Sequence, residues 1–349
     1  MQRERYFDAV KAVLILLVVY CHAVEIGACG TEWGRTIHLF INVFVMPAFL
    51  FIQGYWSKSA AMSDQKILGR ILLFFVLFCA GKLLYYGGYY LIDGVLPPWT
   101  GETFWHEGSV PWYMLSSVFF TGSLWLLREL KGKRILMLCV AIGVAAGCFS
   151  SIGTWLSLSR TLVFMPFYCV GYYFPESWMR KWLDWKNLGE GGRLRGGIMA
   201  GLLAALCLTR LLLAKAPAIY DIGIPLFWGN AGYAAVGLSM IQGCFVRAAC
   251  YLASVVLGAA VLLAVPAQTG FVWVDLAAAQ MGRNTLPVYL LHYPVLLLLC
   301  RKVFPAEMPI LLLFAVCIVL TLILSAPVLS KPIAWLRAKT LEMAAPNGD

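Results

Sequence analysis

The feature that most constrains this chain is a series of long apolar runs that contain isolated ionisable residues. The first run, "YFDAVKAVLILLVVYCHAVE" at residues 6–25, carries Asp8 and Lys11 near one end and His22 and Glu25 near the other. A charged side chain at the centre of a membrane costs about 2.5 kcal/mol or more. Ionisable residues inside an apolar run therefore indicate a site or a pathway.

Apolar runs recur along the whole chain and predict membrane-spanning helices. The 349 residues are 61% hydrophobic and 13% charged, against about 45–50% apolar and about 25% charged in soluble domains. A spanning helix needs about 20 apolar residues, and barrel strands would alternate apolar with polar residues, which these runs do not. The runs cover residues 9–28, 36–56, 67–92, 110–127, 135–150, 158–174, 197–214, 220–246, 249–266, 284–300 and 309–330.

We therefore expect an all-α fold, a polytopic transmembrane helical bundle with about 10–11 spans. No segment between the runs is long enough to fold as a soluble domain, so we expect a single domain over residues 1–349. The basic start of the chain permits a signal peptide. Asp8 and Lys11 interrupt the charged-then-apolar order of such a peptide, however, and favour a retained first helix.

The net charge of +10 is distributed by side of the membrane and does not indicate nucleic-acid binding. Basic residues precede the first run and follow the second, fourth and sixth, so the positive-inside rule places the N-terminus in the cytoplasm and the loop 93–109 outside. Eleven spans would leave the C-terminal tail outside, although Lys331, Arg337 and Lys339 favour the inside. Ten spans would satisfy the charges, so we expect that one run is not a full span; the candidates are the short, glycine-interrupted runs 135–150 and 158–174 and the long region 220–266.

The eleven cysteines lie mostly inside apolar runs, where cysteine behaves as a small hydrophobic residue. Their odd number and the lack of paired spacings argue against a disulfide framework. No C-x-x-C pattern indicates a metal site, so we expect no metal.

Lys11 and His22 share one face of the first predicted helix. Eleven residues amount to three turns plus about 20°, and they separate the two residues by about 16 Å along the axis. Asp8 and Glu25 lie three residues from Lys11 and His22 respectively, within reach on the same surface. A neutral imidazole beside a carboxylate is what a general base requires. Cys21 is about 100° around the helix from His22, so we expect it to face elsewhere.

Later runs carry further polar side chains, namely His38, Asn42, Arg160, Asn284, Tyr289 and His292. Tyr289 and His292 lie one turn apart, and Asn284 is a residue type that caps helices. Other interpretations exist for such residues. Lys11 could be a lysine that extends to the membrane surface, and the histidines could be packed core residues.

Six blocks of the sequence resemble integral-membrane acyltransferase family three. The first-helix stretch "YFDAVKAVLILLVVYCH" is similar to the family signature, in which Y-x-D-x-x-(Arg or Lys) is followed ten residues later by His. The other blocks, in the family's order, are "FVMPAFLFIQGYW", "QKILGRILLFF", "VPWYMLSSVFF", "SRTLVFMPFYCVGYYF" and "MGRNTLPVYLLHYPV". No single block is specific, but the ordered set covers most of the chain.

The resemblance implies transfer of an acyl group, usually acetyl, from cytoplasmic acyl-CoA to a hydroxyl of a cell-surface or lipid-linked saccharide. It implies acetyl-CoA as co-substrate and a location in a bacterial cytoplasmic membrane, among membrane lipids. His22 would be the general base, and the other catalytic candidates are Lys11, Glu25, Tyr289 and His292.

Binding residues follow from the resemblance and from the chemistry of the donor. Coenzyme A is a polyanion and requires cations, which we expect from Lys11, Lys58, Lys66 and Arg70. The candidates for contact with the acceptor are His38, Asn42, Trp112, Arg160 and Asn284.

The chain departs from the family pattern at three positions. Lys11 replaces an arginine that many members carry, Val45 stands where a histidine often precedes "MP", and Gln53 stands where a serine often precedes the glycine. Two other functions compete with acyl transfer. A transporter or flippase of a polar or lipid-linked molecule would also contain buried polar groups, but no internal repeat of the Lys11-to-His22 pattern is visible. The second is a non-catalytic sensing or scaffold module.

Overall fold

The structure, a computed structural model, confirms the expected all-α architecture. It describes residues 2–61, 63–94, 104–106, 110–187, 191–304 and 308–345. Within these ranges the β-structure is limited to an isolated bridge between His106 and Trp155. Most of the predicted outer loop 93–109, including Glu102 and Glu107, lies outside the described residues.

The first half of the chain contains three long helices followed by shorter ones. These helices are α1 (Gln2–Gly27), α2 (Glu32–Ser57), α3 (Asp64–Asp93), α5 (Trp112–Gly122), α6 (Leu124–Leu127), α7 (Gly132–Ala145), the 3₁₀ turn η1 (Ala146–Cys148), α8 (Leu158–Tyr173) and α9 (Glu176–Asn187). α2 begins soon after α1 ends because the Thr31 side chain accepts a hydrogen bond from the Gly34 N–H at 3.0 Å.

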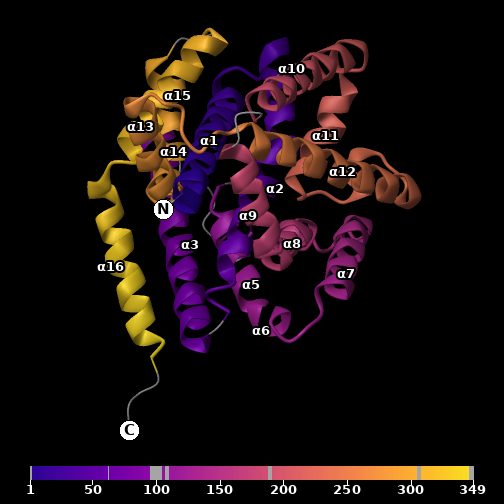
Figure 1. Cartoon of the computed structure of the whole chain (residues 1–349). Coiled ribbons are helices and arrows are strands. Elements are labelled where there is room, and N and C mark those ends of the chain that lie inside the picture. The colour runs from indigo at the N-terminus through magenta and orange to yellow at the C-terminus, as the bar shows by residue number, and fades with distance from the viewer. Residues whose placement is uncertain are drawn as a thin grey trace.

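The second half mixes long and short helices in the same way. These are α10 (Gly191–Lys215), α11 (Ala218–Trp228), the 3₁₀ turn η2 (Tyr233–Val236), α12 (Met240–Ala264), α13 (Val272–Arg283), α14 (Thr285–Leu298) with the π-helical turn η3 (Leu299–Val303), α15 (Ile310–Leu324) and α16 (Pro327–Met343). Figure 1 shows α1 and α2 in the middle of the bundle, with α13 to α15 on one side and α10 to α12 on the other.

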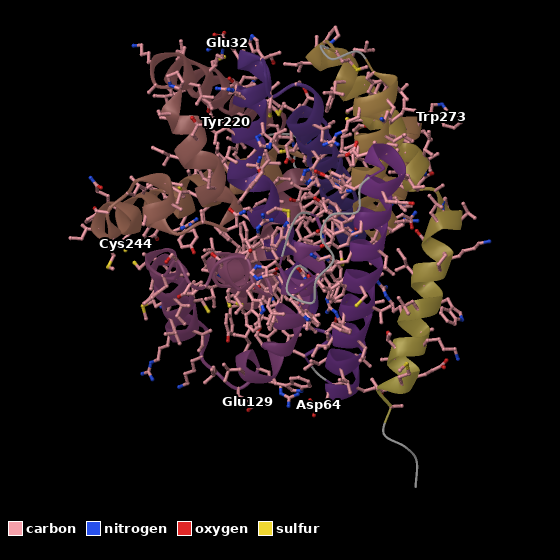
Figure 2. All side chains as sticks on the ribbon, turned by 180° about the vertical axis from the view of Figure 1, so that it is seen from behind. Glu32, Asp64, Glu129, Tyr220, Cys244 and Trp273 are labelled. Atoms are coloured by element: carbon pink, nitrogen blue, oxygen red, sulfur yellow. The ribbon has the colours of Figure 1, made fainter. Side chains whose placement is uncertain are left out.

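Six helices in the described part of the chain are long and apolar enough to cross a membrane: α1, α2, α3, α10, α12 and α14 with η3. α15 and α16 together pass the same test but are bent by 52° at the break between them. Figures 1 and 2 both show α16 running beside α3 towards the C-terminus. Other predicted runs, such as 110–127, form shorter apolar helices.

The prediction of one helix over 220–246 is wrong. α11 ends at Trp228, and α12 begins only at Met240. The new helix begins there because Ser239 and Gln242 form a capping box, in which each side chain satisfies a backbone N–H of the other. The intervening residues, which we call the 229–239 segment, pack against η1 and α12 through η2. The apolar composition of the run concealed this break.

α1 and α14 run side by side in the same direction. At one end Asp8 of α1 binds Arg283, the last residue of α13, which lies two residues before α14 begins. Further along, the rings of His22 and His292 are in contact, with centroids 5.3 Å apart. α1 also packs against α2, α13 and α15, so its polar face is enclosed by helices rather than by lipid.

Candidate active site

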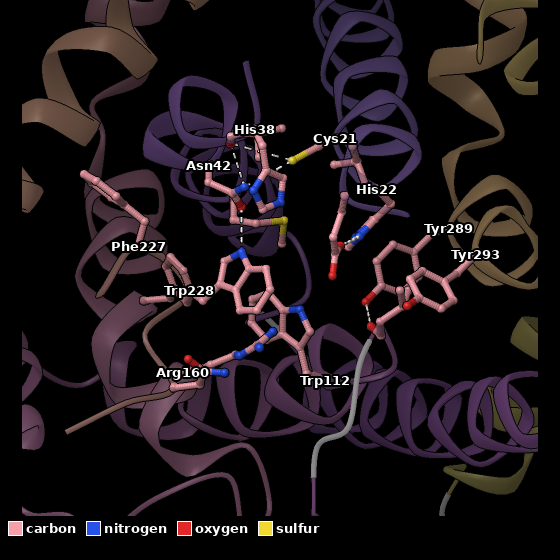
Figure 3. A pocket seen from close by; sticks show the side chains of 17 residues that line it. Cys21, His22, His38, Asn42, Trp112, Arg160, Phe227, Trp228, Tyr289 and Tyr293 are labelled. Carbon is pink, nitrogen blue, oxygen red and sulfur yellow. Dashed lines mark hydrogen bonds and ion pairs between the residues drawn. The ribbon is translucent and has the colours of Figure 1, made fainter. Parts of the chain in front are cut away.

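A cavity of about 160 Å³ lies between α1, α2, α5, α8, α11 and α14. The predicted residues that line it are His22, Glu25, His38, Asn42, Trp112, Arg160 and Tyr289. Figure 3 shows Tyr289 and Tyr293 on one side of the cavity and Phe227 and Trp228 on the opposite side. Residues from distant parts of the sequence therefore meet at one place.

His22 is oriented by the carboxylate of Glu25. The His22 Nδ1 atom lies 2.8 Å from Glu25 Oε2, and both side chains are partly exposed to the cavity, at 27% and 29%. An ionised carboxylate can only accept a hydrogen bond, so Nδ1 of a neutral His22 carries the hydrogen. The other ring nitrogen, Nε2, then has a free lone pair, which is the tautomer that a general base needs.

His292 is the second histidine of the site and is fully buried behind His22. Its Nδ1 atom lies 3.0 Å from the Val288 carbonyl oxygen and 2.9 Å from the Tyr289 carbonyl oxygen, so it carries a hydrogen. Its Nε2 atom has no hydrogen-bond partner among the described residues. His292 therefore presents a hydrogen-bond acceptor close to His22. The Tyr289 hydroxyl donates to the Val110 carbonyl oxygen.

His38 and Asn42 lie on α2 at the far side of the cavity from Tyr289 (Figure 3). The Nδ1 atom of His38 is 2.8 Å from the Tyr220 hydroxyl, while its buried Nε2 atom has no hydrogen-bond partner in the described ranges. Asn42 accepts a hydrogen bond from Trp228 Nε1 at 2.9 Å through Oδ1. Its Nδ2 atom donates to the His38 carbonyl oxygen at 2.8 Å. The hydrogen bond to Asn42 thus fixes the Trp228 ring in the wall of the cavity.

Cys21 also lines the cavity, contrary to the expectation that it faces elsewhere. Its Sγ atom accepts a hydrogen bond from Asn42 Nδ2 at 3.1 Å. Cys21 and His22 are about 100° apart around α1, but the cavity is wide enough to contact both side chains. Cys21 is only 5% exposed, so it is part of the cavity wall and is not a reactive thiol open to solvent.

Arg160 brings a buried positive charge to the cavity. Its guanidinium carbon lies 4.8 Å from the ring centre of Trp112 and 5.8 Å from that of Trp228, so two aromatic rings hold it. Figure 3 shows Arg160 near both tryptophans. Trp228 and Asn230 also line the cavity, and sequence analysis missed both, because the end of α11 at Trp228 and the segment that follows it lie inside the apolar run 220–246.

A second cavity, of about 240 Å³, continues along α1 towards Lys11. It shares the wall residues Val18, Met46 and Tyr289 with the first cavity. Gln53 is in its wall. Gln53 accepts a hydrogen bond from the Tyr113 hydroxyl at 3.0 Å and donates to Ser117 at 3.1 Å. Gln53, one of the three residues that depart from the family pattern, is therefore part of the wall of this second cavity.

A third cavity, of about 380 Å³, lies at the N-terminal end of α1 and shares Lys11 and Trp56 with the second. Lys11 Nζ lies 3.0 Å from one oxygen of the Asp8 carboxylate, and Arg283 Nε lies 3.1 Å from the other. Arg283 stands in the quoted block "MGRNTLPVYLLHYPV", but sequence analysis did not single it out. The three cavities together follow α1 from Asp8 to Glu25.

The remaining predicted residues are not among those that line these three cavities. Lys58 donates to the Phe174 carbonyl oxygen, and Lys66 is exposed. Arg70 lies over the Phe74 ring at 6.0 Å, and Asn284 accepts a hydrogen bond from Ser330 at 2.6 Å. In the part of the chain that the structure describes, no group of three or more His, Cys, Asp or Glu side chains is placed to hold a metal ion.

Comparison with protein families identifies the chain. The sequence profile described as "Acyltransferase domain" matches residues 4–329, nearly the whole chain, and these residues include all three cavities. Comparison with curated proteins and with solved structures gives no match. The match over nearly the whole chain and the long apolar helices lead to one conclusion: the chain belongs to this acyltransferase family and is an integral-membrane acyltransferase.

Proposed function

We propose that this protein is an O-acyltransferase that moves an acyl group, namely acetyl, from acyl-CoA to a hydroxyl of a cell-surface or lipid-linked saccharide. One observation carries the proposal: the His22–Glu25 pair lies in a cavity that shares walls with a second cavity at Lys11. This arrangement supports a base and an entry route for an anionic donor along one helix.

The proposed reaction begins at His22. Nε2 takes the proton of the acceptor hydroxyl while the hydroxyl oxygen bonds to the carbonyl carbon of the thioester. Glu25 holds Nδ1 and stabilises the imidazolium that forms. The tetrahedral intermediate then breaks its C–S bond, and the thiolate takes the proton back from His22. The products are an ester of the acceptor and free coenzyme A.

The donor is proposed to enter from the Asp8 end of α1. Lys11 and Arg283 both bind Asp8, so two cations face one carboxylate at this entrance. The local excess of positive charge favours a polyanion such as coenzyme A. Its long, thin pantetheine arm suits the second cavity, whose lining includes Phe49, Ile52 and Trp56. The thioester would then reach the first cavity past Val18 and Met46.

The acceptor is proposed to bind opposite His22. Trp112 and Trp228 offer aromatic surface, and Arg160 and His38 offer polar groups. Among the described residues, His38 Nε2 is buried and has no hydrogen-bond partner, so a hydroxyl of a bound sugar could satisfy it. A saccharide with apolar ring faces and hydroxyl edges fits this combination.

The membrane orientation follows the charge distribution. We propose that the N-terminal end of α1 faces the cytoplasm of a bacterial cell, where acyl-CoA is made, because of the basic residues beside the first run. His22 then lies towards the opposite side, where a cell-surface acceptor is available. This orientation lets a cytoplasmic donor and an external acceptor meet in the first cavity.

Radiolabelled acetyl transfer tests this proposal. Membranes that contain the protein receive acetyl-CoA labelled in the acetyl group, and the lipid-linked and polysaccharide fractions are then separated. The proposal predicts covalent label that mild alkali releases, as expected of an ester, and no label with His22→Ala. Unlabelled glycans with the wild-type protein would instead favour transport of a polar or lipid-linked substrate.

A further inference from the structure

Tyr233 of η2 is held between two Gly-Cys pairs. A Cβ atom on Gly147 would lie 2.4 Å from the Tyr233 ring, and one on Gly243 would lie 2.1 Å from it. Only glycine therefore allows η1 and α12 to approach the ring this closely. The ring is 1% exposed, and its hydroxyl donates to the Val144 carbonyl oxygen at 2.6 Å. Tyr233 is the anchor of the 229–239 segment.

The residue after each glycine is a cysteine. Cys148 follows Gly147 at the end of η1, and Cys244 follows Gly243 in the first turns of α12. Their Sγ atoms lie 3.8 Å apart. A disulfide is about 2.05 Å long, so the two sulfurs need to approach by about 1.8 Å. Both cysteines are partly exposed, and Figure 2 shows Cys244 at the edge of the molecule.

We propose that Cys148 and Cys244 form a disulfide that fastens η1 to α12 around Tyr233. Two thiols lose two protons and two electrons, and one S–S bond forms. The oxidant is a protein disulfide that reacts by thiol–disulfide exchange and is itself reduced to two thiols. Both residues are partly exposed, which such an exchange reaction requires.

The start of α7 indicates on which side of the membrane the pair lies. Basic residues lie just before α7 and in its first turn (Arg128, Lys131, Lys133 and Arg134), so in the proposed orientation α7 begins at the cytoplasmic side and Cys148, which follows its end, lies towards the other side. Cys244 lies beside Cys148. This step rests on the proposed cytoplasmic N-terminus. Disulfides form and persist on the periplasmic side of a bacterial membrane.

The disulfide would stabilise one wall of the acceptor cavity. The 229–239 segment connects Trp228 and Asn230, both in that wall, to Tyr233. Arg247 of α12 donates to the Leu226 carbonyl oxygen at the end of α11 and so ties the same region to α12. A covalent link between η1 and α12 therefore fixes the position of the segment from both sides.

A second pair of cysteines in this chain provides an internal control. The Sγ atoms of Cys139 and Cys169 are 3.6 Å apart, slightly closer than those of Cys148 and Cys244. Cys169, however, is fully buried between α7 and α8. An exchange partner cannot reach a buried sulfur, so this pair is expected to stay reduced.

Differential alkylation of the full-length protein tests the proposal. Membranes are denatured directly into N-ethylmaleimide, then reduced and treated with iodoacetamide, and the peptides are identified by mass spectrometry. Cys148 and Cys244 should carry the second label, whereas Cys139 and Cys169 should carry the first. N-ethylmaleimide on Cys148 and Cys244 of the wild-type protein would overturn the proposal. This readout does not depend on acyl transfer, so its failure is distinct from failure of the proposed function.

Thermal unfolding in detergent tests the stabilising role. Dithiothreitol should lower the Tm of the wild-type protein by about 5 °C. The double variant Cys148→Ser, Cys244→Ser should unfold at the lower temperature and not respond to dithiothreitol, while Cys139→Ser should respond like wild type. If dithiothreitol leaves the Tm of the wild-type protein unchanged, the disulfide does not stabilise the contact between η1 and α12.

Discussion

The rings of His22 and His292 lie 5.3 Å apart between centroids, and the Nδ1 atom of each is held by a hydrogen-bond acceptor. Glu25 holds His22, and backbone carbonyl groups hold His292. Neither ring can turn without losing its hydrogen bond. The Nε2 atoms of both neutral rings are therefore acceptors, and the imidazolium formed at His22 lies next to a neutral histidine.

Loss of the His22 imidazole should remove the base without removing the donor site. His22→Gln should lower acyl transfer by about 10²- to 10⁴-fold, the usual contribution of general base catalysis. Donor affinity should stay within about twofold, because Lys11 lies in a separate cavity. His106→Gln, which changes a histidine outside the cavity walls, is the matched control. Transfer at the wild-type rate by His22→Gln would exclude His22 as base.

Lys11 should affect the donor more than the acceptor. Lys11→Ala removes one of the two cations on Asp8 and should raise the KM for acyl-CoA about 10- to 100-fold, the loss of one charge-assisted interaction. Lys11→Arg keeps the charge and should restore most of the affinity. The KM for acyl-CoA and the KM for the acceptor are measured separately, which shows which of the two substrates Lys11 affects. An increase only in the KM of the acceptor would place the donor elsewhere.

Asn42 should act through Trp228 rather than by direct contact with the acceptor. Asn42→Ala breaks the 2.9 Å hydrogen bond to Trp228 Nε1, and Trp228→Phe breaks the same bond while keeping an aromatic ring. Each single variant should raise the KM of the acceptor. Because the two changes remove one shared interaction, the double variant should lose less than the product of the two effects. Fully multiplicative effects would mean that Asn42 binds the acceptor independently.

The contact between α2 and α8 should tolerate no side chain at Gly54. A Cβ atom there would lie 2.0 Å from the Tyr168 carbonyl oxygen. Gly54→Ala should therefore destabilise the protein by about 1–3 kcal/mol through overpacking. Gly201→Ala on α10 is the control, since nothing lies within 4 Å of the added atom. Equal Tm values for the two variants would contradict the packing of α2 against α8.

The sequence predicts those parts of the site that depend on the regular geometry of a helix. The spacing of Lys11 and His22 on α1, and their pairing with Asp8 and Glu25, follow from 3.6 residues per turn and agree with the structure. Which cavities these residues line depends on the neighbouring helices, and no single-helix pattern contains that information.

The missed residues have two different physical causes. Trp228 lies on a short helix whose apolar composition matches that of a spanning helix, and the break after it depends on local capping at Ser239. Arg283 is 67% exposed and looks like an ordinary basic residue at the end of a helix. Its role at the entrance becomes visible only because α13 packs against α1 and brings it to Asp8.

The most direct test of the central claim is binding and slow hydrolysis of acetyl-CoA by the purified protein in detergent. Wild type is compared with Lys11→Ala and His22→Ala. The account predicts saturable binding that Lys11→Ala weakens, and hydrolysis that His22→Ala abolishes while binding remains. Absence of binding by the wild-type protein at millimolar acetyl-CoA, or hydrolysis that persists in His22→Ala, would contradict it.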